Sequence, residues 1–125
     1  MSRSLAREVA FKTIYSKFFN AETDFDMENA DYKDLEFTTK ILSCFAENFN
    51  EINETISSKL KGYTVERLYK IDFAILILAV IELNYIKENP KEVIINEAVE
   101  LAKKYSTEKS PKFINGVLAD IVSNK

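Results

Sequence analysis

The chain has 125 residues, of which 46% are hydrophobic, and a formal net charge of -3. This length is enough for one buried core, and the scarcity of glycine and proline, two of each, argues against disorder. The mild acidity argues against strong nonspecific binding of nucleic acid, which usually needs a strongly basic surface. Residues 1–125 are therefore expected to form a single domain.

The first third of the chain predicts one helix and an acidic connection. Residues 3–19 have helical periodicity, with Arg3, Arg7 and Phe11 at four-residue steps along one face. Residues 20–34 are rich in Asp and Glu without the glycine that a calcium loop needs at its sharp turn. We interpret them as a solvated acidic connection.

The middle of the chain predicts a long helix, a short helix and a central apolar helix. Residues 35–60 carry a heptad-like seam, which could face another copy of the chain but is expected to pack within the domain. The seam consists of Thr38, Leu42, Phe45, Phe49, Ile52 and Ile56. Gly62 is expected to cap this helix, and residues 64–68 to form a short one. Residues 69–87 should be the central helix, too short in its apolar part to span a membrane.

The last third predicts two amphipathic helices joined by a polar turn. Asn89 is the expected N-cap of the first, with Pro90 at its first helical position. Ser110 and Pro111 open the second by the same logic. Because no stretch shows the two-residue period of strands, the fold class is all-α.

Nothing in the sequence indicates catalysis, a cofactor or a metal site. The chain contains no histidine, which removes the usual general base and the commonest metal ligand. Cys44, the only cysteine, cannot form an intramolecular disulfide; we expect a buried or half-buried, inert thiol and a cytoplasmic protein. Glu97 and Glu100 with the neighbouring Lys103 and Lys104 are interpreted as surface ion pairs.

Two local features favour binding of single-stranded RNA. Arg3 and Arg7 place two guanidinium groups one turn apart, with Tyr15 on the adjoining surface. Arginine binds phosphates in a bidentate manner, and exposed aromatic rings stack on bases. The second feature is the turn over residues 106–112, where Lys109 and Lys112 precede Phe113. Taken alone, either feature also fits solvated cations beside an inward-packing aromatic side chain.

Four stretches of the sequence resemble the bacterial transcription antitermination factor NusB in their order and spacing. They are Ala6-Arg7-Glu8 with Tyr15, Asp72–Leu83, Val93–Lys103, and Lys112–Leu118 with Asp120. The resemblance implies an all-helical fold of two small bundles. It also implies binding of boxA RNA together with the ribosomal protein NusE, which helps RNA polymerase read through terminators on ribosomal RNA operons.

The resemblance also assigns roles to particular residues. Arg7, and with a weaker match Arg3, occupy the arginine-rich start that contributes to RNA binding in the family. The other matched RNA positions are Tyr15, Lys112, Phe113 and Asn115. Asp72 occupies the acidic position on the side that faces NusE, so RNA and NusE are expected on different surfaces.

The sequence departs from the family pattern in two places. Only two arginines stand at the start, and Phe73, Ile77 and Ile81 replace two basic residues and a tyrosine of the central motif. We therefore expect weak binding of boxA RNA by the chain alone and stronger binding by its complex with NusE.

Three alternatives stay open from sequence. One is a relative of the RNA-holding modules of ribosomal RNA methyltransferases, although a chain ending at Lys125 has no room for a catalytic domain. Another is a protein-interaction domain without RNA binding. A homodimer that hides Arg3 and Arg7 is also conceivable.

Overall fold

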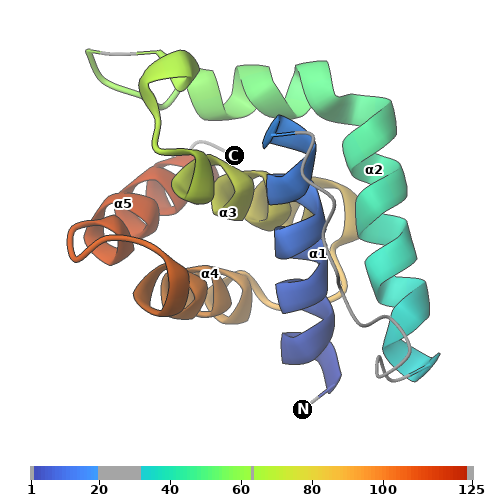
Figure 1. The fold of residues 1–125 in the computed structure, drawn as a ribbon. Helices are drawn as coiled ribbons and strands as arrows, with labels where there is room; N and C mark the ends of the chain where they lie inside the picture. Colours follow the sequence, from blue (N-terminus) through green and yellow to red (C-terminus); the bar gives the residue numbers. More distant parts are fainter. Residues whose placement is uncertain (1, 20–31, 63, 124–125) are drawn as a thin grey trace.

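The computed structural model describes residues 2–19, 32–62 and 64–123 and contains helices and no strand over these ranges. The all-α prediction is confirmed (Figure 1). In chain order the elements are α1 (Ser2–Phe19), α2 (Tyr32–Ser57), η2 (Val65–Arg67), α3 (Lys70–Ile81), η3 (Glu82–Ile86), α4 (Lys91–Tyr105) and α5 (Ser110–Ser123). The predicted acidic connection falls mostly on residues 20–31, outside the described ranges.

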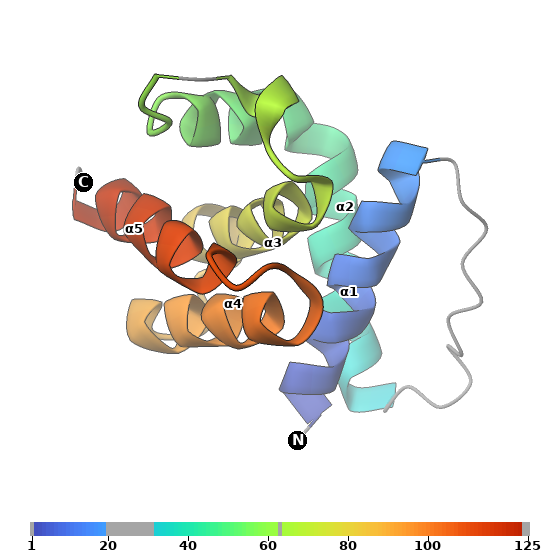
Figure 2. The same ribbon diagram turned by 60° about the vertical axis from the view of Figure 1, so that its left-hand side comes forward.

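Helix α3 is the centre of the molecule. Its residues from Asp72 to Ile81 are all buried, as the unbroken apolar run requires. Helices α1 and α2 pack together against one side of α3, and α4 and α5 pack together against the other (Figures 1 and 2). The structure thus has the two small helical groups that were predicted, joined through α3. None of the described helices is both long and apolar enough to cross a bilayer.

Helix α2 directs its predicted seam into the core of the same chain. Phe45, Ile52 and Ile56 are buried, and Leu42 and Phe49 pack against them partly exposed. The helix is not straight, because Asn48 leaves helical geometry (φ -125°, ψ 20°), and the bend is visible in Figure 1. The intramolecular use of the seam is therefore confirmed.

Two predicted helix boundaries are wrong in detail. Helix α2 ends at Ser57, so Gly62 lies in the following loop, where its positive φ of 85° suits glycine, instead of capping the helix. Helix α4 takes Pro90 as its N-cap, one residue later than predicted. With its amide oriented to satisfy both donors, the Asn89 oxygen accepts hydrogen bonds from Arg3 and Arg7 instead.

Candidate functional site

The turn between α4 and α5 is tied to the first turn of α3 by Asp72. One carboxylate oxygen of this buried side chain accepts a hydrogen bond from Ser106 Oγ (2.5 Å), and the other accepts one from Ser110 Oγ (3.0 Å). The Thr107 backbone N–H also donates to Ser110 Oγ at 3.3 Å. Because both ends of the turn are attached to one carboxylate, the turn has a fixed position relative to α3.

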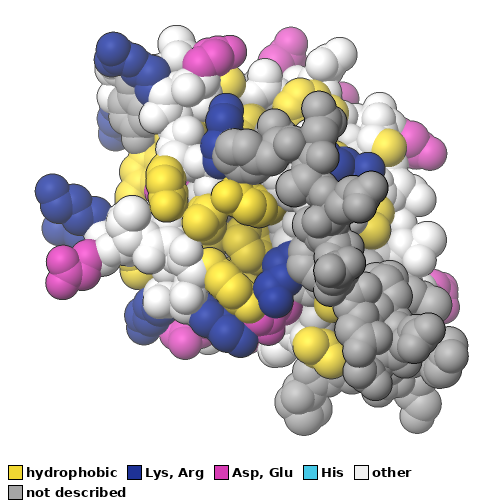
Figure 3. Space-filling model, viewed as in Figure 1, with side chains coloured by type: hydrophobic (Ala, Val, Ile, Leu, Met, Phe, Trp, Pro, Cys, Tyr) yellow, Lys and Arg dark blue, Asp and Glu magenta, His cyan; other side chains and the backbone are white. Residues whose placement is uncertain are grey.

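A shallow hollow of about 200 Å³ lies beside this attachment. Its lining comes from η2, the start of α3 and the α4–α5 turn: Arg67, Leu68, Tyr69, Asp72, Thr107, Lys109, Ser110 and Phe113. In Figure 3, basic side chains flank a hydrophobic area on this side of the molecule, over the loop after α2 and over the α4–α5 turn. The hollow combines cationic, hydroxyl and aromatic groups.

The hollow brings together residues that were predicted to serve two different partners. Lys109 and Phe113 were predicted to contact RNA, and Asp72 to face NusE, yet all three line the same hollow. Lys112 and Asn115 are exposed and line a recess between α4 and α5 instead. Asp72 therefore does not lie on a surface separate from Lys109 and Phe113, because the turn packs directly on the start of α3, and which partner each residue meets stays a prediction.

Arg7 is enclosed in the protein. Its side chain is 4% exposed, and its Nε and Nη2 atoms lie 2.7 and 2.9 Å from the two carboxylate oxygens of Glu82, itself 2% exposed. Glu97 adds a third oxygen at 3.5 Å. Burial disfavours the charge of Arg7, but the hydrogen bond and charge of Glu82 outweigh it, so the pKa of Arg7 is raised.

The expectation that Arg7 presents a free guanidinium at the surface does not agree with this geometry. The residue instead joins α1 to η3 and α4, and an RNA contact would require its ion pair with Glu82 to open. Four-residue spacing placed Arg7 on the same face as Phe11, which is also buried. That face points inward.

Arg3 and Tyr15 stand near opposite ends of α1. Arg3 Nη2 lies 2.7 Å from a Glu88 oxygen, and its guanidinium carbon is 4.3 Å from the centre of the Phe37 ring. Hydrogen bonds from Lys40 and Arg3 lower the pKa of Glu88. Tyr15 is half-buried against the core. Twelve helical residues separate Arg3 from Tyr15, about 18 Å along the axis, so they do not form one compact patch.

The middle of α1 is held to the end of α4 through Glu8. This carboxylate accepts a hydrogen bond from Lys104 Nζ at 2.8 Å and another from the Tyr105 hydroxyl. Burial alone would raise the pKa of Glu8, but these partners lower it. Of the predicted surface ion pairs, Lys103 with Glu100 is confirmed at 3.2 Å. The pairing of Glu97 and Lys104 is wrong, because Glu97 contacts Ser4 and Arg7 while Lys104 binds Glu8.

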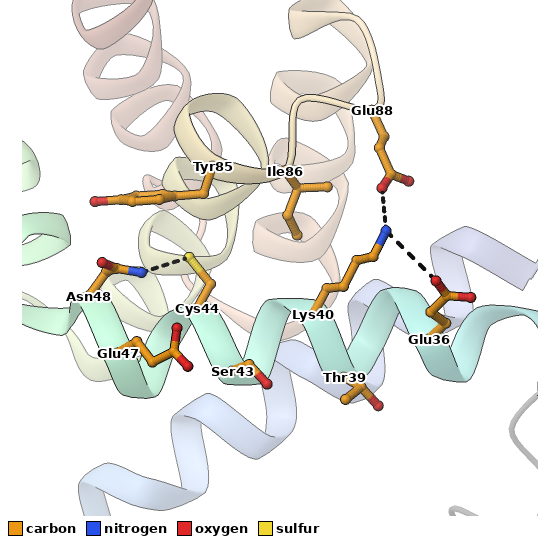
Figure 4. Close-up of a pocket in the computed structure, with 10 residues that line it drawn as sticks. All are labelled: Glu36, Thr39, Lys40, Ser43, Cys44, Glu47, Asn48, Tyr85, Ile86 and Glu88. Atoms are coloured by element: carbon orange, nitrogen blue, oxygen red, sulfur yellow. Dashed lines mark hydrogen bonds and ion pairs between the residues drawn. The ribbon is translucent and has the colours of Figure 1, made fainter.

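A larger groove of about 840 Å³ lies between α2 and η3 (Figure 4). Several of its polar groups are paired: Lys40 binds Glu88 and Glu36, and Asn48 donates a hydrogen bond to Cys44 Sγ (Figure 4). The predicted burial of Cys44 is confirmed, and burial raises the pKa of its thiol. Among the residues that the structure describes, no group of three side chains could hold a metal ion.

Two residues of the hollow, Arg67 and Tyr69, were not among the predicted site residues. Both stand at the boundary between η2 and α3, on either side of the buried Leu68. The only local signal was the predicted short helix over residues 64–68, which does not tell whether the following tyrosine points inward or outward.

Comparison with known proteins gives a consistent family assignment. The NusB family matches residues 4–123. The chain is 38% identical over 132 residues to the transcription antitermination protein NusB of Finegoldia magna, covering 100% of this chain and 96% of the relative. It is also 38% identical over 143 residues to NusB of Clostridium botulinum (strain Kyoto), covering 98% and 100%.

Solved structures agree with this assignment over nearly the whole chain. NusB of T. maritima superposes with a TM-score of 0.90 at 34% identity, covering 98% of this chain and 92% of that one. A crystal structure of the antitermination factors NusB and NusE in complex with dsRNA matches with a TM-score of 0.89 at 26% identity, covering 99% and 98%.

Proposed function

The chain belongs to the NusB family, and we propose that it acts in the cytoplasm as a noncatalytic transcription antitermination factor. In this proposal it binds boxA-type single-stranded RNA together with the ribosomal protein NusE. The resulting complex helps RNA polymerase to read through terminators on ribosomal RNA operons. The main support is the near-complete match to a NusB that was crystallised with NusE and dsRNA.

The proposed RNA contacts centre on the α4–α5 turn and the start of α5. Lys109 and Lys112 are exposed and form no ion pair within the described ranges, so both are available to phosphates. Phe113 offers a partly exposed ring for stacking, and Asn115 an exposed amide for hydrogen bonds to base edges. On α1, Arg3 would exchange Glu88 for a phosphate.

Arg7, Tyr15 and Asp72 take different positions in this proposal. Arg7 positions α1, and its direct contact with RNA stays a prediction. Tyr15 stays a predicted RNA contact through the exposed part of its ring. The Asp72 carboxylate accepts hydrogen bonds from Ser106 and Ser110 and holds the turn in place, and its contact with NusE stays a prediction. A homodimer likewise stays a prediction.

The test is fluorescence anisotropy of a labelled boxA-type RNA with and without NusE at two salt concentrations. We expect weak binding by the chain alone, tighter binding with NusE, and a shallow salt dependence. Three phosphate contacts, from Arg3, Lys109 and Lys112, give a log–log slope of about -2.1. Lys112→Ala should weaken binding, whereas Lys103→Ala, a lysine paired with Glu100, should not. Absence of RNA binding even with NusE would overturn the proposal.

A further inference from the structure

Tyr69 presents an aromatic ring to solvent at the rim of the hollow. Of the three large hydrophobic side chains that the described residues expose, Leu5, Tyr69 and Val93, it is the aromatic one, at 54% exposure. Its backbone is anchored on both sides. The preceding Leu68 is buried, and the Tyr69 carbonyl accepts a hydrogen bond from the Phe73 N–H at 3.0 Å. The ring is therefore held at the surface by a fixed segment of chain.

Basic side chains border the hollow at whose rim this ring stands. Arg67 and Lys109 line the same hollow as Tyr69, and neither forms an ion pair within the described ranges. Other basic residues, such as Arg7 and Lys104, are bound to carboxylates of the chain itself. The hollow thus places two cations beside an exposed aromatic ring, together with one carboxylate, Asp72, which accepts hydrogen bonds from Ser106 and Ser110.

The cationic surface continues past Phe113. This side chain lines both the hollow and a second recess, which is formed by the loop after α2 and the outer face of α5. Lys59, Lys61 and Lys112 line that recess, together with Asp120. Two adjoining depressions therefore share an aromatic wall and are bordered by basic residues, as in proteins that bind single strands along a charged groove.

We propose that Tyr69 is a base-stacking platform for single-stranded RNA and that Arg67 and Lys109 bind the phosphates beside the stacked base. The inference rests on the proposed function and adds a binding element to it. An exposed ring stacks on any base because every base has a π face, and cations beside the ring match the neighbouring phosphates. A protein partner with acidic groups would satisfy the two cations, but it would leave the exposed ring without a comparable role.

Substitution of Tyr69 separates ring stacking from other contributions. Tyr69→Ala should raise the dissociation constant for single-stranded RNA between about 5-fold and about 150-fold, the range expected for one lost base–aromatic stack. Tyr69→Phe keeps the ring and should stay within about twofold of the wild type. Val93→Ala, at a hydrophobic side chain on α4 that is 42% exposed, is the control and should leave RNA affinity unchanged.

Substitution of the two cations tests the phosphate contacts. Arg67→Ala and Lys109→Ala should each reduce the magnitude of the salt slope by about 0.7. Lys91→Ala, an exposed lysine at the opposite end of α4, should not change the slope. If all three variants keep the wild-type slope while the wild type binds RNA, Arg67 and Lys109 are not phosphate ligands and the inference is wrong.

A direct readout is available because the chain contains no tryptophan. In Tyr69→Trp the indole is the sole tryptophan, and its emission should be quenched when RNA is added and stay unquenched when NusE alone is added. Quenching by NusE without quenching by RNA would identify the hollow as a protein-binding site and overturn the inference. Wild-type protein that binds no RNA would refute the proposed function itself, whereas RNA binding that is indifferent to Tyr69 refutes only this inference.

Discussion

The buried pair between Arg7 and Glu82 makes a sharp prediction about stability. Replacement of Arg7 by Met keeps most of the aliphatic stem but leaves the Glu82 carboxylate, 2% exposed, without its two close donors. Removal of one partner from a buried pair typically costs about 3–5 kcal/mol, because the remaining charge is uncompensated. With a urea m-value of about 2 kcal/mol per molar, the unfolding midpoint should fall by roughly 2 M.

The assay is urea unfolding followed by far-ultraviolet circular dichroism. Lys103→Ala is the control, because its partner Glu100 is solvent-exposed, and it should change the free energy of unfolding by less than about 1 kcal/mol. The double variant Arg7→Met with Glu82→Leu should recover much of the loss, since it removes both charges. This pattern would identify a structural ion pair.

The opposite result would restore Arg7 as an RNA contact. The free energy of unfolding of Arg7→Met could instead lie within about 1 kcal/mol of the wild-type value while its RNA affinity falls tenfold or more. Arg7 would then act mainly by contacting RNA, and its buried ion pair would not be its main role. RNA binding is measured under conditions in which the circular dichroism spectrum shows the variant to be folded. Loss of affinity then cannot be confused with loss of structure.

Three further predictions follow from contacts elsewhere in the molecule. Asp72→Ala should lower the free energy of unfolding by about 1–3 kcal/mol in urea titrations, because it leaves two hydroxyl groups of the α4–α5 turn without their acceptor. Asp72→Asn keeps one acceptor oxygen and should retain part of this stability. The lowered pKa of Glu8 means that its stabilising pairing with Lys104 is present above the ordinary carboxyl pKa and is lost as the pH falls through the lowered value. The stability difference between the wild type and Glu8→Gln should therefore shrink from about pH 6 to about pH 3 in urea titrations. The buried Cys44, with its raised thiol pKa, should react at least about tenfold more slowly with a disulfide reagent in the native than in the urea-unfolded protein; equal rates would contradict its burial.

The sequence predicted the helices well because their apolar residues repeat at helical spacing. The unbroken apolar run of α3 required neighbours on every side, and the structure supplies them. Boundaries were less predictable. Asn89 was predicted as the N-cap of α4, but Pro90 takes that position. The Asn89 oxygen instead accepts hydrogen bonds from Arg3 and Arg7, which lie far away in the sequence.

The candidate site was less predictable because its residues are placed by long-range contacts. Seventy-five positions separate Arg7 from Glu82, and no local pattern reveals that the two side chains meet. The exposure of Tyr69 is also set by a long-range contact, because it depends on how the α4–α5 turn packs against the start of α3. Periodicity predicts which face of a helix is apolar, but not which polar residue is enclosed by a neighbouring helix.

The distribution of charge resolves the tension between a net charge of -3 and a proposed RNA-binding function. The carboxylates of Glu8, Glu82 and Glu88 are each bound to basic side chains of the chain itself, which limits the negative field that they project. Arg67 and Lys109 have no such partners within the described ranges. Since salt screens exposed charges beyond about 8 Å at physiological ionic strength, a phosphate at the hollow responds to these two cations more than to the total charge. An acidic chain can therefore bind RNA through one local surface, at the cost of a shallow salt dependence and modest affinity, which is the situation in which a second protein such as NusE contributes most.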